Sequence, residues 1–170
     1  LQGRCAGMTS DLTQLAAARS GFPDPEQHTI LEERLSKEPM APAVVGGDQR
    51  MADAMRWVVF ALIEAEERGI TQANVDEVFK TAQADQSQAA LRRFLGVDGG
   101  LGSKLGLPDD FVVQVIRATG HYGEIYDRHL GRDSAVTIPR SVNRLAGDGG
   151  LMVSCLLYTS DAADDSWGGG

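Results

Sequence analysis

The segments of this chain that could form β-strands are few, short and far apart. Residues 3–8, 28–31 and 43–45 are the candidate strands, and helical segments or proline-containing loops separate them. A strand needs neighbouring strands for its backbone hydrogen bonds, and these three need not pair with one another. The sequence therefore predicts a helix-rich piece of an α/β protein, with few short strands whose partners lie outside these residues.

The helical segments carry recognisable start and end signals. Asp48 is a good N-cap for a long helix that runs to about Arg68, with apolar residues at three- and four-residue steps and Gly69 after its end. Thr9 or Ser10 is expected to cap a helix that runs to about Arg19. Further helices are expected from residue 71, over residues 85–95, 108–119 and 122–130, and over 141–146, with a glycine-rich loop or broken turn over 96–106.

The charge balance excludes two classes of partner. The chain has 16 basic and 24 acidic residues and a formal net charge of −8. Binding to nucleic acid or to an anionic membrane surface needs clustered Lys and Arg, so we expect neither partner.

The longest strongly apolar run, residues 57–63, is far shorter than the roughly 20 residues that span a bilayer. The two cysteines exclude a disulfide-dense scaffold and a multi-cysteine metal site.

Both ends of the chain are unusual. The first residue is Leu, and no secretion signal is visible, although a signal can be recognised only at a true N-terminus. Residues 154–165 resemble translated sequencing-adapter read-through, so residues 153–170 are expected to be a non-native tail. The alternative is a short strand followed by a glycine-rich disordered end. Without the three Asp residues of the tail, 21 acidic residues still exceed 16 basic ones (24 − 3 = 21).

Several patterns suggest chemistry at first and then fail on spacing. The glycine-rich residues 96–104 lack the P-loop order, because Ser103 precedes Lys104, and Leu105 stands where the dinucleotide fingerprint needs Gly or Ala. Two histidines, 121 and 129, are eight residues apart, whereas a helical metal pair needs a spacing of four. Both histidines, with the neighbouring carboxylates 124 and 127, are interpreted as solvated helix residues. The carboxylates 64, 66 and 67 are likewise interpreted as a solvated face.

Asp11 is the carboxylate whose position favours ligand binding. It follows a candidate strand directly and stands at a helix start beside Thr9 and Ser10. Ligands of open α/β sheets usually bind at the carboxyl ends of strands, and a carboxylate fixed there can pair with a ligand ammonium group. The alternative is that Asp11 is only a first-turn carboxylate that interacts with the helix dipole. The residue chemistry leaves both interpretations open.

A family resemblance runs through most of the chain. Residues 3–11, Gly-Arg-Cys-Ala-Gly-Met-Thr-Ser-Asp, resemble the Gly-Arg-x-Asp-Ala-x-x-x-Asp segment of periplasmic amino-acid-binding proteins, the extracellular solute-binding protein family 3. The likeness continues in the same order through residues 36–44, 56–57 with 60–71, 95–97, 105–107, 120–126 and 149–152. Residues 56–57 and 60–71 look like the long helix of the general L-amino-acid-binding subgroup. Ala6 and Met51 depart from the family pattern, at an internal Asp and at an aromatic position.

This resemblance implies a fold and a division of the chain. It implies the C-terminal part of a two-lobed type II periplasmic-binding-protein fold, whose complete chain is about twice as long. Residues 1–35 would be the end of the second lobe, and residues 36–47 the hinge crossing and the return strand. Residues 48–152 would be the C-terminal helical part of the first lobe. With most strand partners missing, we expect the 170 residues to fold poorly alone.

The resemblance also implies a function. The family captures a free L-amino acid between its lobes by hinge closure and delivers it to an inner-membrane ABC transporter permease. It is periplasmic and performs no catalysis, and we expect a monomer with no cofactor and no metal. Asp11 matches the carboxylate that contacts the ligand's α-amino group, with Ser10 and Thr9 beside it. Two alternatives are a dehydratase-like enzyme of the same fold, acting on an amino-acid precursor, and a receptor's sensory domain.

Overall fold

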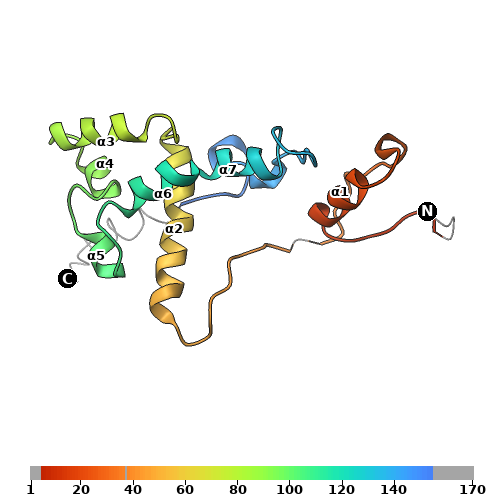
Figure 1. The fold of residues 1–170 in the computed structure, drawn as a ribbon, viewed down its shortest axis with the longest axis horizontal. Helices are drawn as coiled ribbons and strands as arrows, with labels where there is room; N and C mark the ends of the chain where they lie inside the picture. Colours follow the sequence, from red (N-terminus) through yellow and green to blue (C-terminus); the bar gives the residue numbers. More distant parts are fainter. Residues whose placement is uncertain (1–4, 37, 155–170) are drawn as a thin grey trace, which may run out of the picture. The chain divides into compact units, whose positions relative to one another are not determined.

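The computed structural model describes residues 5–36 and 38–154, and these divide into two compact units (Figure 1). One unit contains the described residues up to Met40 together with Tyr126–Arg140. The other contains Ala41–Ile125 and the described residues from Ser141 onward. The predicted tail, residues 153–170, lies outside the described residues except for its first two, and the predicted hinge crossing lacks residue 37.

The larger unit is a layer of helices around the long helix α2. Its α-helices are α2 (Gln49–Glu67), α3 (Val75–Ala84), α4 (Ala89–Phe94), α5 (Leu101–Leu105) and α6 (Phe111–Thr119), followed by α7 (Tyr122–His129), which crosses the boundary between the units. Helix α2 packs against α5 and α6, and α3 packs against α4 and α6 (Figure 1). The shared core is apolar and includes Ala61, Ala65, Ile70, Val75, Leu95, Val113 and Ile116.

Helix α2 begins and ends where the sequence predicts. The Asp48 carboxylate accepts a hydrogen bond from the backbone N–H of Met51 at 2.9 Å, which satisfies one of the open donors of the first turn. At the other end Gly69 has φ +65°, and the N–H of Ile70 donates to the carbonyl of Ala65 at 2.8 Å. This is the left-handed glycine termination that the sequence pattern favours.

The predicted start of the next helix at Thr71 is wrong by one turn. Thr71 and Asn74 bind each other: the Thr71 N–H donates to Asn74 Oδ1 at 2.7 Å, and the Asn74 N–H donates to Thr71 Oγ1 at 3.2 Å. This reciprocal turn satisfies the backbone before the helix starts, so α3 begins at Val75.

The expected helix over residues 85–95 is also shorter than predicted. Asp85 is the C-cap of α3, and its carboxylate accepts hydrogen bonds from Ser87 and from the Gln88 amide. These bonds lower the pKa of Asp85 from 3.8 to about 2, first through the Ser87 hydroxyl and then through Gln88. Helix α4 therefore starts only at Ala89.

The glycine-rich segment 96–106 contains a helix, contrary to the expected loop. Helix α5 occupies Leu101–Leu105, and the glycines around it let two stretches of backbone approach closely. A Cβ at Gly96 would lie 1.8 Å from the carbonyl oxygen of Asp109, and one at Gly102 would lie 2.0 Å from that of Pro108. The glycines thus serve backbone packing.

The predicted strands are absent from the described residues. Residues 28–31, 43–45 and the described part of 3–8 belong to no strand, and the β-pairing in the described part is one isolated bridge between Leu145 and Met152. A ladder requires a neighbouring strand, and no described segment supplies one. The expected last helix is replaced by two 3₁₀ turns, Ser141–Asn143 and Ala146–Asp148. The architecture is the helix-rich partial lobe that the fold class predicts.

The smaller unit is built around helix α1 (Leu12–Ser20) and a 3₁₀ turn, Pro25–Gln27. Arg19 Nε donates to the carbonyl of Pro25 at 3.1 Å, which ties the turn to the end of the helix. The rings of Phe22 and His28 lie 4.5 Å apart across the same loop. None of the helices within the described residues is long and apolar enough to cross a bilayer.

Candidate functional site

The predicted ligand residues lie together at the start of α1. Asp11 is the N-cap, with φ −58° and ψ 144°, and its carbonyl accepts the first helical hydrogen bond from Leu15 N–H at 2.9 Å. The expectation that Thr9 or Ser10 would cap this helix is therefore wrong. Both of these residues are exposed, and the Ser10 hydroxyl donates to the Gln14 side chain.

The Asp11 carboxylate is not used as a helix cap. Its side chain accepts no capping hydrogen bond from the first turn, although Asp at this position usually does. Asp11 is half-buried and stands at the N-terminal end of α1. Such a group can accept hydrogen bonds from an ammonium group. The ligand-binding role of Asp11, Ser10 and Thr9 stays a prediction.

Glu64 contradicts the interpretation of residues 64, 66 and 67 as a solvated face. It is only 2% exposed, and its carboxylate accepts a hydrogen bond from Arg68 Nε at 2.6 Å. The Arg68 guanidinium lies over the ring of Phe94, 5.4 Å from its centroid. Loss of water around the Glu67 carboxylate, and then the nearby charge of Glu64, raise the pKa of Glu67. Glu64 and Arg68 thus form an ion pair at the end of α2 that serves the fold.

His121 and Glu124 are also structural, where the sequence analysis expected solvated residues. The Glu124 carboxylate accepts from the His121 N–H at 2.9 Å, while His121 Nδ1 accepts from the Gly123 N–H at 3.1 Å. This is a capping box, and Glu124 also accepts from the Gln72 N–H at 3.1 Å. A Glu three residues after a capping residue could have signalled it. His129 is exposed, as expected.

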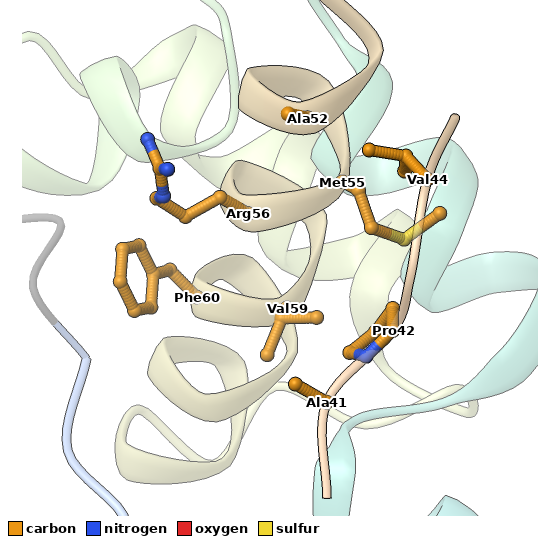
Figure 2. A pocket seen from close by; sticks show the side chains of 8 residues that line it. All are labelled: Ala41, Pro42, Val44, Ala52, Met55, Arg56, Val59 and Phe60. Atoms are coloured by element: carbon orange, nitrogen blue, oxygen red, sulfur yellow. The ribbon is translucent and has the colours of Figure 1, made fainter. Parts of the chain in front are cut away.

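A hollow of about 310 Å³ lies along α2, and we call it the α2 groove (Figure 2). It is lined by Ala41, Pro42, Val44, Ala52, Met55, Arg56, Val59 and Phe60. Figure 2 shows Met55 extending toward the segment 41–44. The side chains of Arg56 and Phe60 extend from α2 on the side of the view opposite that segment. The lining is apolar apart from Arg56, whose guanidinium already binds Asp53 at 2.9 Å.

The described residues contain no group of three or more side chains arranged to hold a metal ion. The polar groups with unusual environments, such as Glu64 and Glu124, are satisfied by neighbours in the fold. Asp11 is therefore the candidate with chemistry to offer a ligand, and the α2 groove is the candidate apolar surface.

The fold defines a class of protein. A structure of an ABC transporter periplasmic binding protein from Brucella ovis, with glutathione bound, matches 85% of this chain with a TM-score of 0.76 and 39% sequence identity. The match covers 44% of that protein's chain. The predicted fold class, part of a periplasmic-binding-protein fold, is confirmed.

The sequence relatives narrow this class. The general L-amino acid-binding periplasmic protein AapJ of Rhizobium johnstonii is 43% identical over 151 residues, and the glutamate/glutamine/aspartate/asparagine-binding protein BztA of Rhodobacter capsulatus is 39% identical over 150 residues. The putative amino-acid ABC transporter-binding protein YhdW of Escherichia coli is 36% identical over 149 residues. Each match covers 88% of this chain. No protein-family model matches the chain.

This chain is thus a relative of the amino-acid-binding periplasmic proteins of ABC transporters, and the resemblance stated from its sequence is confirmed. It spans less than half the length of these relatives, 43%, 43% and 42% respectively.

Proposed function

We propose that these residues belong to the substrate-binding component of an amino-acid ABC transporter, which captures free L-amino acids between two lobes by hinge closure. The complete protein is called the full-length parent below. The observation that carries the proposal is the 43% identity to a general L-amino acid-binding periplasmic protein, over 88% of the chain. The fold shared with a ligand-bound periplasmic binding protein supports it.

In this proposal Asp11 binds the α-ammonium group of the ligand, and Ser10 and Thr9 add polar contacts beside it. The carboxylate suits this role because it has no capping bond to the helix. Residues 1–35 then belong to the second lobe, residues 36–47 to the hinge crossing and return strand, and residues 48–152 to the first lobe. Residues 153–170 are a non-native tail.

The proposed protein binds its ligand and releases it unchanged. The relatives are named as binding proteins, and none of these names supports the dehydratase-like alternative. Its partner is an inner-membrane permease, its compartment is the periplasm, and it acts as a monomer without nucleic acid. A catalytic role would require a general acid or base that faces the ligand besides Asp11.

Glutathione is the second ligand to consider, because the Brucella ovis structure holds it. Its γ-glutamyl end carries a free α-ammonium and a free α-carboxylate, as a free amino acid does. Asp11 could therefore accept the same hydrogen bonds from either ligand. The two ligands differ in the volume that each occupies beyond the shared α-ammonium and α-carboxylate groups. A comparison of their affinities therefore reports on the size of the pocket and not on the role of Asp11.

A thermal-shift screen of the full-length parent distinguishes these ligand classes. Each L-amino acid, glutathione and a D-amino acid control is added at increasing concentration. A ligand that binds only the folded protein raises Tm, and the rise grows with concentration. We expect L-amino acids to raise Tm and the D-amino acid to leave it unchanged. Recovery of the ligand intact after prolonged incubation supports binding without turnover, and consumption contradicts it.

The role of Asp11 is tested with Asp11→Asn and a matched control, Glu33→Gln. Both changes remove one carboxylate charge from the same compact unit, and Glu33 is exposed. A hydrogen bond to a charged group is worth about 1.5–3 kcal/mol, so Asp11→Asn should weaken binding by about 10- to 100-fold. Glu33→Gln should leave affinity unchanged. Equal affinities for the two variants contradict the assignment of Asp11 and leave the proposed function standing.

A further inference from the structure

Helix α7 begins with a histidine as its cap. The first N–H groups of a helix have no partner within the helix, and a Ser, Thr, Asn or Asp side chain usually accepts from one of them. At α7 the acceptor is the ring of His121. Its Nδ1 accepts from the Gly123 N–H at 3.1 Å and from the Glu124 N–H at 3.4 Å. Histidine differs from the usual caps because histidine side chains change charge between about pH 8 and pH 5.

These two hydrogen bonds require one particular form of the ring. Nδ1 accepts a hydrogen bond only when it carries no proton, so the ring that caps α7 is neutral and has its hydrogen on Nε2. A histidine ring that gains a second proton is a donor at both nitrogens. The N–H groups of Gly123 and Glu124 then face a donor and lose their acceptor.

The charged neighbours of the His121 ring do not replace this acceptor. The Glu124 carboxylate lies on the other side of the ring, with Oε2 3.6 Å from Nε2, a nitrogen that carries hydrogen in both forms. Its Oε2 already accepts from the His121 N–H and from the Gln72 N–H. Gln72, in the turn before α3, has no charge, and Arg117 of α6 donates from Nε to Asp76 at 3.0 Å. Glu124 therefore attracts a charged ring without supplying the missing acceptor.

The later part of α7 is held by other contacts. The Tyr126 hydroxyl donates to the carbonyl of Pro139 at 3.3 Å, and the Leu130 N–H donates to the carbonyl of Tyr126 at 2.8 Å. The His121 side chain is 15% exposed, so water can reach the ring. We propose that His121 is a pH-sensitive cap: binding of a proton at Nδ1 releases the first turn of α7, and loss of the proton closes it again. This inference does not depend on which ligand the parent binds.

Nuclear magnetic resonance of the isotope-labelled full-length parent tests this cap. The nitrogen signal of His121 Nδ1 reports whether this atom carries a proton. Hydrogen exchange at the Gly123 and Glu124 amides, corrected for the intrinsic effect of pH, reports whether the turn is closed. Loss of a cap should lower the protection of both amides by about fivefold between about pH 8 and pH 5, as the ring gains its proton. Unchanged protection while the ring gains its proton overturns the proposal, and so does a ring that stays neutral throughout this range.

Two matched variants assign the effect to one histidine. Asn is a usual helix cap that carries no charge, so His121→Asn should keep the turn closed and give constant protection over the same pH range. His129→Asn removes the exposed histidine at the other end of α7 and should retain the fall of about fivefold. A fall that persists in His121→Asn, or that disappears in His129→Asn, assigns the pH dependence to another group and overturns the proposal.

Discussion

At the scale of one residue, Asp85 sets a helix boundary. It is the C-cap of α3, and its hydrogen bonds to Ser87 and Gln88 keep α4 from starting at this position. Its carboxylate accepts from the Ser87 N–H at 2.9 Å and from the Gln88 amide at 2.7 Å. The hydrogen bonds hold the charged form, which is why the pKa falls to about 2. A group with a lowered native pKa stabilises the fold above its unfolded pKa and loses that effect as the pH falls through the native value.

Asp85→Asn in the full-length parent should therefore lower stability at pH 7, and the difference from wild type should shrink as the pH falls from about 4 toward about 2. Urea-unfolding midpoints across this range measure it. Ser87→Ala, which removes the hydroxyl donor, should weaken the same pH dependence. A difference that stays constant between pH 7 and pH 3 would contradict this account of Asp85.

Two glycines with similar backbone conformations differ in how closely other atoms approach them. Substituting each of them separates the effect of a left-handed backbone from the effect of a close contact. Gly69 has φ +65° and open space around its Cα, whereas Gly96 has φ +75° and lies against the Asp109 carbonyl. Gly69→Ala should lower the free energy of unfolding by about 1 kcal/mol, because Ala is unfavourable in the left-handed backbone conformation. Gly96→Ala should cost about 3 kcal/mol or more, because backbone must also move. Similar losses for both, measured by urea unfolding of the full-length parent, would show that contact at Gly96 is unimportant.

At the scale of one element, α2 shows which features its sequence could predict. Asp48 and Gly69 are local signals, and both act as expected. Glu64 is buried and binds Arg68, whose guanidinium lies over the ring of Phe94, and no local pattern reports this contact between distant segments. The start of α3 was missed because the reciprocal hydrogen bonds between Thr71 and Asn74 satisfy the backbone one turn before the helix begins.

The Glu64–Arg68 pair should stabilise the end of α2 more than an exposed pair on the same helix. Glu64→Gln leaves the Arg68 charge, a quarter exposed, without its carboxylate, which should cost about 2 kcal/mol. Asp53→Asn breaks the exposed pair with Arg56 and should cost less than about 0.5 kcal/mol. Chemical denaturation of both variants of the full-length parent measures the contrast. Equal losses would mean that burial adds nothing at Glu64.

At the scale of the whole molecule, the features that were hardest to predict are those that depend on pairing between distant segments. The candidate strands form no ladder because no described segment pairs with them. The position of Asp11 at a helix start could be predicted from the local sequence. The groups that would face Asp11 from another lobe could not be predicted in this way. The acid excess, 24 acidic against 16 basic residues, is the reason to expect a partner other than nucleic acid, and this stays a prediction.

Calorimetric titration of the full-length parent with L-amino acids tests the central claim most directly. The account predicts heat that saturates at one ligand per chain, with free L-amino acids recovered unchanged. An absence of binding heat with every L-amino acid, at several temperatures, would contradict the proposed function.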